Sequence, residues 1–526
     1  MENFSNEQIV VLAIGILLLV NSYFFFFKGQ KTWGLLLLVL GTLGLGFFMA
    51  MLDPFLFHWD EQYHALVAKN LAINPLKPVL IQHSLGGLDY HIWTYNHVWL
   101  HKQPLFLWQM ALSIKLFGTN EIAVRLPSII MHAIVPLFIY RIGKIAVNAN
   151  VGYYGALFSA VASFPLELIS GFYPTDHNDV AFLFYVCASC WAWFEYQKSK
   201  QLYWVVLIGV FSGAAILVKW LAGLLVFALW PAAETIERLP KFSPWQTLRP
   251  MLLAFSMCCL VAIPWQVHIH TQFPQEAAYE YTMMHEHFGK AVEGHGGDMW
   301  FHFDYGLKQI YGSGQGVAWL LLMGSVTLMF RANSLLFRAA IGVAVVGVYG
   351  FYTLAATKMI AFPLIVAPFL FLGLGALTDG VFGFLRNYTN RLAYRIVKFS
   401  ACFAVCFLLM DMHLIHQHRA LAYKGQLNEY RIKKIQERKL VQIVDSVLQS
   451  KPHVLFNAGL MPGGDITFLF FSNHIAFGGL PAPEDVMKAK REYPNVPIAI
   501  IDHGQPLPDY LNNDAEIRII CSKERR

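Results

Sequence analysis

Long apolar segments separated by short polar connections occupy most of this chain. A helix that crosses the hydrocarbon core of a bilayer needs about 20 mostly apolar residues. About twelve segments approach this length. They lie at residues 8–27, 33–52, 121–140, 151–173, 180–196, 203–219, 220–234, 250–266, 312–330, 337–356, 359–378 and 397–416. The pattern predicts an all-α polytopic membrane domain over residues 1–416.

The pattern changes after residue 416. Residues 417–526 combine charged helical stretches with short apolar runs such as HVLFNA, PIAIIDH and EIRIIC. Short apolar runs bounded by polar segments are typical of strands. We therefore expect residues 417–526 to form a small external α/β domain, accessory to the membrane domain.

Composition agrees with a membrane protein. The 526 residues are 56% hydrophobic and 14% charged, whereas soluble proteins carry about 25% charged residues. The net charge of +6 is explained by basic cytoplasmic loops, so it does not indicate nucleic-acid binding. Six of the seven cysteines lie in apolar stretches, and their spacing indicates neither a disulfide framework nor a zinc site.

Lysine and arginine alternate between the loops and so predict the orientation. The basic loops contain Lys28 and Lys31; Arg141 and Lys144; Lys198 and Lys200; Arg238, Lys241 and Arg249; Arg331 and Arg338; and Arg386, Arg391, Arg395 and Lys398. Short basic loops remain in the cytoplasm. The other loops, including the long ones at about 53–120 and 267–311, and the tail are therefore expected outside. The first segment lacks a basic start and a cleavage site, so we expect a retained helix.

Ionisable residues inside the predicted segments lie near their outer ends. They are Glu121, Arg125, Glu167, Lys219 and Asp411. A charge at the centre of a spanning helix costs about 2.5–3.5 kcal/mol, so such positions are informative. Long side chains also reach the interface for purely structural reasons. The shared sidedness nevertheless indicates that polar function gathers at the outer boundary.

The first outer loop begins with an acidic pair, Asp60 and Glu61. Apolar positions follow at helical spacing over residues 63–71, which predicts an amphipathic helix on the membrane surface. From their spacing alone, the two acids are better explained by helix capping, with Asp60 as the N-cap and Glu61 as a first-turn acid. The loop ends with His101 and Lys102, and Pro104 is placed to open a second surface helix. A lysine at the interface can neutralise the phosphate of a lipid.

Three further outer segments carry candidate residues. Asp176 and Asp179 flank the start of the segment at 180–196, where capping is again an alternative. The second long loop supplies the metal-binding residue types His285, Glu286, His287, His295 and His302. Their spacing matches no metal template, so a divalent cation stays open and no cofactor is assigned. Lys358 lies between two late segments.

Together these motifs resemble the polyprenyl-phosphate-sugar-dependent glycosyltransferases of the GT-C fold. This superfamily includes protein O-mannosyltransferases and the transferases that add aminoarabinose to lipid A. The resemblance rests on WDEQYHALVAKNL, HKQPLFLWQMALSIKLFGTNEIAVRLPS, NDVAFLF and KMIAFPLIVAPF. It covers roughly residues 50–235, and more thinly 280–305 and 355–370.

The resemblance implies roles for individual residues. Asp60 matches the essential acid of the first outer loop, and Lys102 matches the lysine that contacts the carrier phosphate. Asp179, with Asp176 as the alternative, matches the second acidic position. His287 and His295 lie near histidines of the family's second large loop. The family often has Pro-Pro at Gln103-Pro104 and Arg-Tyr at Tyr63-His64, so the sugar and the carrier stay open.

These observations predict a sugar transferase of the inner membrane whose active site is periplasmic. The donor is a polyprenyl-phosphate-linked sugar, and the acceptor is lipid A, a surface glycan or a protein. Asp60, Asp179 and Glu61 are the catalytic candidates; Lys102, His101, Asp176, His287, His295 and Lys358 are the substrate-binding candidates. A single displacement implies inversion at the anomeric carbon.

Two other classes of protein were weighed. A transporter or flippase of lipid-linked sugars commonly has repeated halves and charges at the membrane midplane. The sequence shows no internal repeat, and its charges lie at the outer helix ends. A non-catalytic scaffold would leave the acidic pair and Lys102 unexplained.

The predicted orientation can be tested by cysteine labelling. A membrane-impermeant thiol reagent added outside should label Cys521 and the variant Ser84→Cys. The variant Ser199→Cys should react only after permeabilisation, because its loop carries Lys198 and Lys200. Labelling of Ser199→Cys from outside would contradict the orientation.

Overall fold

The structure is a computed structural model that describes residues 4–174, 176–239, 244–312 and 314–522. The chain divides into two compact units. The first comprises Met1–Met51, Lys102–Phe106 and Ser128–His418. The second comprises Leu52–His101, Leu107–Pro127 and Arg419–Arg526. The first long loop and the tail therefore share one compact unit, a division that differs from the predicted boundary at residues 416 and 417.

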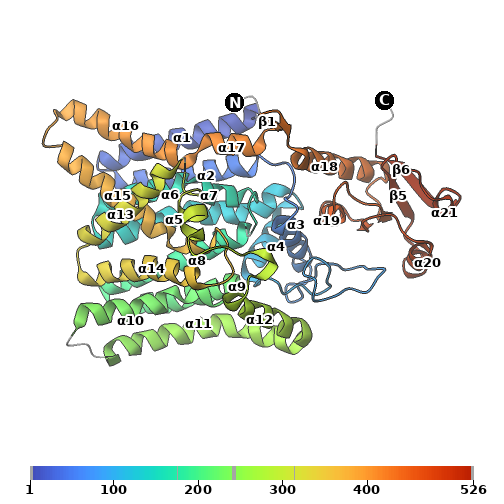
Figure 1. Cartoon of the computed structure of the whole chain (residues 1–526), viewed down its shortest axis with the longest axis horizontal. Coiled ribbons are helices and arrows are strands. Elements are labelled where there is room, and N and C mark those ends of the chain that lie inside the picture. Colours follow the sequence, from blue (N-terminus) through green and yellow to red (C-terminus); the bar gives the residue numbers. More distant parts are fainter. Residues whose placement is uncertain (1–3, 175, 240–243, 313, 523–526) are drawn as a thin grey trace. The chain divides into compact units, whose positions relative to one another are not determined.

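The first unit is a helical bundle (Figure 1). Its elements are α1 (Asn6–Phe27), α2 (Lys31–Ala50), the greater part of α5 (Glu121–Ala146), α6 (Ala149–Val161), α7 (Ser163–Ile169), α8 (Asp176–Ser199), α9 (Leu202–Lys219), η1 (Trp220–Leu224), α10 (Leu225–Arg238), α11 (Pro244–Gln272), α12 (Pro274–Gly289), η2 (Val292–Gly294), η3 (His302–Leu307), α13 (Gln315–Arg331), α14 (Leu335–Leu354), η4 (Phe362–Val366), α15 (Ala367–Leu385), α16 (Arg391–Met410) and α17 (Met412–Arg419).

Within the described residues, eight helical stretches are long and apolar enough to cross a membrane. They are Asn6–Phe27, Lys31–Ala50, Glu121–Ala146, Leu202–Arg238, Trp245–Gln272, Leu335–Leu354, Phe362–Leu385 and Arg391–Arg419. A multi-pass membrane domain is thus confirmed, whereas the expected count of about twelve spans is not.

The structure interrupts one predicted segment and one of the eight apolar stretches. The segment at 151–173 breaks into α6 and α7 at Ala162, whose backbone is extended. Pro165 explains the break, because its ring collides with the carbonyl four residues earlier in a continuous helix. The stretch Leu202–Arg238 contains a turn at Trp220, where φ is +57°. This turn coincides with the boundary predicted between the segments at 203–219 and 220–234.

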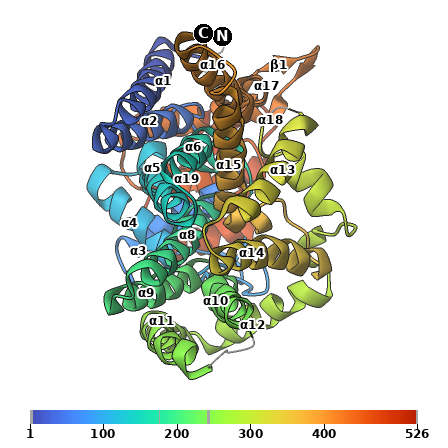
Figure 2. The ribbon, with the colours of Figure 1, turned by 90° about the vertical axis from the view of Figure 1, so that its left-hand side faces the viewer.

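The connections that carry the basic residues meet at one end of the bundle. Arg141 of α5 pairs with Glu195 of α8, with 2.6 Å between Nε and Oε1. Arg331 of α13 pairs with Asp379 of α15 at 2.7 Å. Figure 1 shows the end of α10, the start of α11 and the connection between α15 and α16 at this end, and Figure 2 views the bundle from it. The basic residues of these connections therefore lie on one side of the bundle, as the predicted orientation requires.

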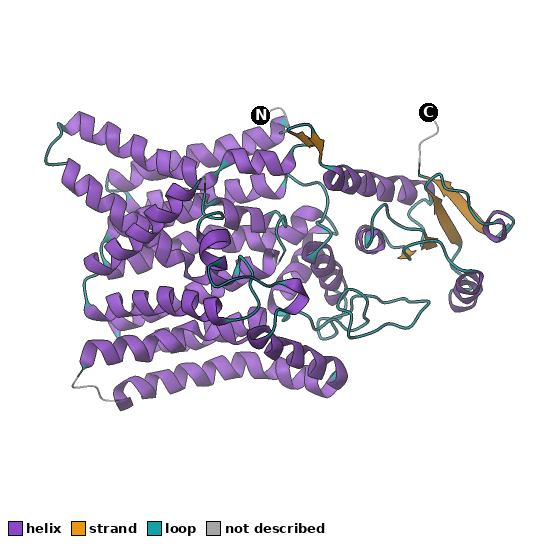
Figure 3. Cartoon of the chain, viewed as in Figure 1, coloured by secondary structure: helices purple, strands orange, loops and turns teal. Residues whose placement is uncertain are grey.

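The second unit contains the α/β domain that the tail predicts. Its elements are α3 (Asp60–Leu71), α4 (Leu105–Phe117) from residue 107 on, the start of α5, β1 (Ala422–Tyr423), β2 (Gln426–Leu427), α18 (Glu429–Val447), β3 (Val454–Phe456), α19 (Gly464–Phe471), β4 (Ile475–Ala476), α20 (Pro483–Glu492), β5 (Ile498–Asp502), α21 (Asp509–Asn512) and β6 (Ile517–Cys521). The strands are confined to the tail (Figure 3).

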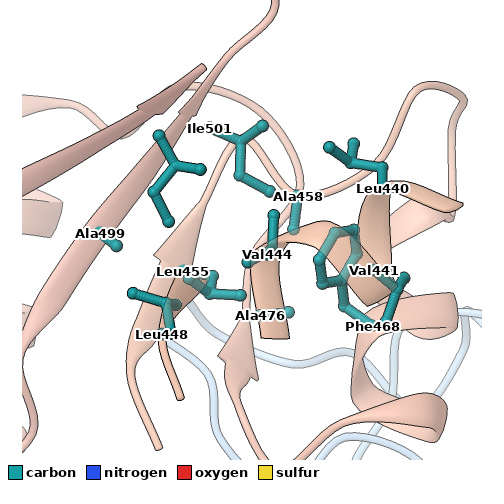
Figure 4. Close-up of a cluster of buried hydrophobic side chains, with 11 residues drawn as sticks. Leu440, Val441, Val444, Leu448, Leu455, Ala458, Phe468, Ala476, Ala499 and Ile501 are labelled. Atoms are coloured by element: carbon teal, nitrogen blue, oxygen red, sulfur yellow. The ribbon is translucent and has the colours of Figure 1, made fainter. Parts of the chain in front are cut away.

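Four of these strands form a parallel sheet in the order β4-β3-β5-β6. The three apolar runs of the tail become β3, β5 and β6, as expected, and the two-residue β4 was not predicted. Helix α18 packs Leu440, Val441 and Val444 against one face of the sheet (Figure 4). Leu85 of the first long loop belongs to the cluster on Val454 and Ile498. The loop is therefore part of the core of the α/β unit.

Candidate active site

Helix α3 carries the acidic pair of the first loop. It spans Asp60–Leu71, as predicted, and Trp59 is its N-cap without a side-chain hydrogen bond. Asp60 is therefore the first helical residue rather than the capping one, and 8% of its surface is exposed. Every residue of α3 except Lys69 is buried, which corrects the expectation of an amphipathic helix with one face open to water.

Glu61 is held by a buried ion pair. Its carboxylate accepts hydrogen bonds from Arg125 Nε at 2.7 Å and Nη2 at 3.1 Å, and from the backbone N–H of Phe57 at 2.8 Å. Both side chains of the pair are fully buried. Arg125 also donates to the carbonyls of Asp53 and Phe55, each at 2.7 Å. This arrangement gives Glu61 a structural role at the start of α3.

Asp53 extends the network to the tail. Its buried carboxylate pairs with Arg419 at 3.0 Å and with Arg431 of α18. Burial alone would raise the pKa of Asp53, but Arg419, Arg431 and Arg125 outweigh it and lower this pKa. We name the set Asp53, Glu61, Arg125, Arg419 and Arg431 the loop–tail ion network. It joins the residues before α3 to α18 of the tail.

A second contact set joins α3 to the tail domain. Lys434 Nζ of α18 lies 2.8 Å from Glu437 Oε1 and 3.2 Å from Gln62 Oε1. Lys69 Nζ donates to the carbonyls of Leu469, Phe470 and Ser472 at 2.7–3.0 Å and so caps α19. Burial lowers the pKa of Lys69 to about 8. Helix α3 is thus held at both ends by side chains shared with the tail.

In the first unit, Asp179 forms an ion pair that the sequence analysis did not assign. Asp179 lies in the first turn of α8 and is 2% exposed. Its Oδ1 lies 2.6 Å from Nζ of Lys219, the last residue of α9. The Lys219 ammonium also lies 5.1 Å from the centre of the Phe362 ring. A lysine at the end of an apolar helix, directly before a break, is the sequence feature that could have identified this partner.

Asp176 is buried and takes part in local contacts. One oxygen of its carboxylate accepts the backbone N–H of His177. The His177 ring nitrogen Nδ1 lies 2.9 Å from the hydroxyl of Ser128. Asp176 is the first residue of α8, and its carboxylate and that of Asp179 lie in one buried turn.

The second long loop is fastened to the segment that contains Lys358. The backbone N–H of Lys358 donates to the His295 carbonyl at 2.8 Å, and that of Thr357 donates to the His287 carbonyl at 3.1 Å. The Lys358 ammonium donates to the last carbonyls of α14, at 2.9 and 2.6 Å. The structure therefore brings His287, His295 and Lys358 together, through backbone bonds.

His302, in the same loop, is buried and neutral. Burial, reinforced by the charge of Lys358, lowers the pKa of His302 to about 4. Among the described residues, no group of three or more His, Cys, Asp or Glu side chains is placed to hold a metal. A role for the His-rich loop in metal binding therefore finds no support in its geometry.

Lys102 is the first residue of a short segment, Lys102–Phe106, that belongs to the first unit, whereas the preceding residue belongs to the second. His101, the last residue of its segment in the second unit, stacks on Trp93 with 4.9 Å between the rings. Gln103, which replaces a proline of the resembling family, accepts a hydrogen bond from Gln266 of α11 at 2.8 Å. Gln266 in turn accepts one from Tyr281 of α12 at 2.9 Å. Helix α4 begins at Leu105, directly after Pro104, as predicted.

The candidate residues are thus assembled in two groups. Asp60, Glu61 and His101 belong to the second unit, whereas Lys102, Asp176, Asp179, His287, His295 and Lys358 belong to the first. The first group holds an acid at the positively polarised start of a helix. The second holds a buried carboxylate, Asp179, paired with Lys219, and a loop whose His287 and His295 carbonyls bond to the backbone of Thr357 and Lys358.

Sequence comparison supports the resemblance over part of the chain. The model of the dolichyl-phosphate-mannose-protein mannosyltransferase family matches residues 101–265. An uncharacterized protein of Aquifex aeolicus (strain VF5) is 28% identical over 148 residues. This stretch is 27% of the present chain and 28% of the relative, so the chain matches little more than a quarter of that curated relative.

Structural comparison covers most of the chain. ArnT from Cupriavidus metallidurans bound to undecaprenyl phosphate superposes with a TM-score of 0.60, at 15% identity and 88% coverage of both chains. The apo state of ArnT gives 0.61 at 15% identity and 89% coverage. The oligosaccharyltransferase AglB from Archaeoglobus fulgidus gives 0.53 at 10% identity, with 85% of this chain and 65% of that chain covered. The GT-C fold is therefore confirmed.

The loop–tail ion network should dominate the stability of the second unit. Arg125→Met leaves the buried carboxylate of Glu61 without its partner, and breaking a buried pair costs about 3–5 kcal/mol. We expect a large fall in the folded fraction that survives heating in detergent, measured by size-exclusion chromatography.

Two variants serve as controls for this measurement. Arg125→Met/Glu61→Leu removes both charges and should recover part of the loss. Lys433→Met removes an exposed pair with Glu429 and should change little. Equal behaviour of Arg125→Met and Lys433→Met would contradict the structural role of the network.

Proposed function

We propose that this protein is a membrane glycosyltransferase that transfers a sugar from a polyprenyl-phosphate donor to a lipid, glycan or protein acceptor. The observation that carries the proposal is the likeness, over 88% of both chains, to an ArnT structure bound to undecaprenyl phosphate. The family match over residues 101–265, which include Lys102 and Asp179, supports it. The basic connections lie together at one end of the bundle, and short basic connections remain in the cytoplasm. This favours catalysis at the other, outer end.

The reaction that we propose is a single displacement. The acceptor hydroxyl oxygen attacks the anomeric carbon, and the bond from that carbon to the phosphate oxygen breaks. The electron pair leaves with the polyprenyl phosphate, and the hydroxyl proton passes to a carboxylate. Because the leaving group departs from the face opposite the attack, the anomeric configuration inverts.

We assign the general base to Asp60 and the leaving-group cation to Lys102. A carboxylate that takes the acceptor proton contributes typically about 10²–10⁴-fold to the rate. A cation at the phosphate stabilises the charge that develops as the bond breaks. Asp179, paired with Lys219 at 2.6 Å, is suited to orient the acceptor. A divalent cation is not required by this scheme.

The structure favours a supporting role for two other candidates. Glu61 is saturated by Arg125 and Phe57 N–H, so we infer that it sets the position of Asp60 rather than exchanging protons. Lys358 caps α14 and holds the loop of His287 and His295. We propose that this loop lines the donor side of the site.

We further propose that the tail positions the acidic loop and is more than an accessory domain. The Glu437 carboxylate of α18 packs closely against the glycine-rich loop before α19. A Cβ atom added at Gly464 would lie only 2.5 Å from Glu437 Oε2, so the loop needs glycine at this position. Lys434 bridges this carboxylate to Gln62, two residues after Asp60. A displaced α18 would therefore displace the start of α3.

Substitution of Asp60 and Lys102 separates their proposed roles. Asp60→Asn should abolish transfer by the purified full-length protein and leave its affinity for the donor lipid nearly unchanged, since the base acts on the acceptor. Lys102→Ala should weaken donor binding as well as turnover. Donor affinity and product formation are measured for both variants.

A matched control is available in the same loop. The Asp89 side chain is half-exposed and, among the described residues, bonds only to His91, so Asp89→Asn should transfer at the normal rate. Near-normal transfer by Asp60→Asn would remove Asp60 from the catalytic assignment. Retention of the anomeric configuration in the product, determined by NMR, would rule out the single displacement.

The positioning role of the tail can be tested at Lys434. Lys434→Met leaves the Glu437 carboxylate buried without its cation and frees Gln62, so we expect kcat to fall about ten-fold or more while donor affinity is retained. The second change Glu437→Gln removes the unpaired charge and should restore folding but not the contact with Gln62. Unchanged kcat in a folded Lys434→Met protein would contradict the positioning role.

A further inference from the structure

A basic cavity lies at the end of the helical bundle that carries the basic connections. It has a volume of about 540 Å³ and is formed where α5, α8 and α10 end and α14 begins. Its lining consists of Lys144, Ile145, Gln197, Lys198, Lys200, Glu237, Arg238, Ser334, Leu336 and Phe337. Neither the proposed transfer reaction nor the comparisons assign a role to this cavity.

The lining carries an excess of positive charge. Four cations, Lys144, Lys198, Lys200 and Arg238, face one carboxylate, Glu237. Of the acids nearby, Glu195 pairs with Arg141, and Glu234 accepts bonds from Gln197 and Thr247 and pairs with Arg238 at 3.5 Å. An anion entering the cavity would therefore meet three lysines, Lys144, Lys198 and Lys200, that form no ion pair among the described residues.

Helix capping accounts for only part of this cluster. Lys144, Lys198 and Arg238 lie in the last turns of their helices, where cations commonly bind the final carbonyls. Among the residues that the structure describes, however, neither the Lys144 nor the Lys198 ammonium makes a hydrogen bond. Lysines that merely capped helices would reach those carbonyls.

The cavity also has an apolar wall. Ile145 and Leu336 are buried, and Phe337 is partly buried beside them. A phosphate at the lysines with hydrocarbon against this wall would satisfy both parts of the lining. Basic pockets between membrane helices bind anionic lipid headgroups in this way, and anionic lipids are enriched at the cytoplasmic leaflet.

We propose that this cavity binds the phosphate of an anionic phospholipid headgroup, with Lys198 and Lys200 as its principal ligands. Arg238 is committed in part to Glu234, 3.5 Å away, and Lys144 adds charge from α5. The proposal is independent of the proposed enzymatic function, because the cavity shares no residue with the candidate site.

Lipid binding by the purified full-length protein in detergent tests this proposal. Native mass spectrometry measures the apparent affinity for phosphatidylglycerol, phosphatidylcholine and inorganic phosphate. Lys198→Gln/Lys200→Gln should bind phosphatidylglycerol about five-fold or more weakly, since each cation near the surface contributes about 1 kcal/mol. Lys28→Gln/Arg391→Gln removes two exposed cations at the same end but outside the cavity, and should change affinity less than about two-fold.

Each outcome decides the proposal. Selective loss in Lys198→Gln/Lys200→Gln, with weak phosphatidylcholine and phosphate binding throughout, supports a lipid headgroup site. An equal loss of phosphatidylglycerol affinity in both double variants would show that overall charge alone attracts the lipid, and would overturn the assignment of lipid binding to the cavity. Inorganic phosphate binding as tightly as phosphatidylglycerol would assign the cavity to a free phosphate compound and overturn the lipid assignment. Size-exclusion chromatography of the variants confirms folding.

Discussion

The loop–tail ion network is the constraint on which the second unit depends. Asp53, Glu61 and Arg125 are buried charges, and burying a charge is costly unless it is paired and hydrogen-bonded. Here Arg125 serves one carboxylate and two carbonyls at once, and Arg419 and Arg431 neutralise Asp53. The start of α3 is thereby defined by electrostatics more than by apolar packing, and its direction follows from the tail.

The loop–tail ion network distinguishes the two acids of the pair in the first loop. Two neighbouring carboxylates in one helical turn have different environments: Glu61 is enclosed by donors and 1% exposed, whereas Asp60 is 8% exposed. Environments that separate two like groups are how proteins divide catalytic from structural roles. The first unit repeats the principle, since Asp179 has a lysine partner and Asp176 has local bonds.

Much of the fold was predictable from local patterns. The apolar segments located the membrane helices because a spanning helix must satisfy its own backbone, and the apolar runs of the tail located β3, β5 and β6. Pro104 marked the start of α4, and the boundary between residues 219 and 220 marked a real turn. The count of spans was less accessible, because the segment at 151–173 breaks into α6 and α7, and the segments at 203–219 and 220–234 form one apolar stretch with a turn.

The sequence by itself determined the class of protein, its helical spans and the candidate residues, because these follow from hydropathy, spacing and residue type along the chain. Only the tertiary structure decided which charges meet. Arg431 lies 378 residues from Asp53 and Lys219 lies 40 residues from Asp179, and no periodicity encodes such pairs. The pairing of buried charges is settled by packing between distant segments, where desolvation penalises every arrangement that leaves a charge alone.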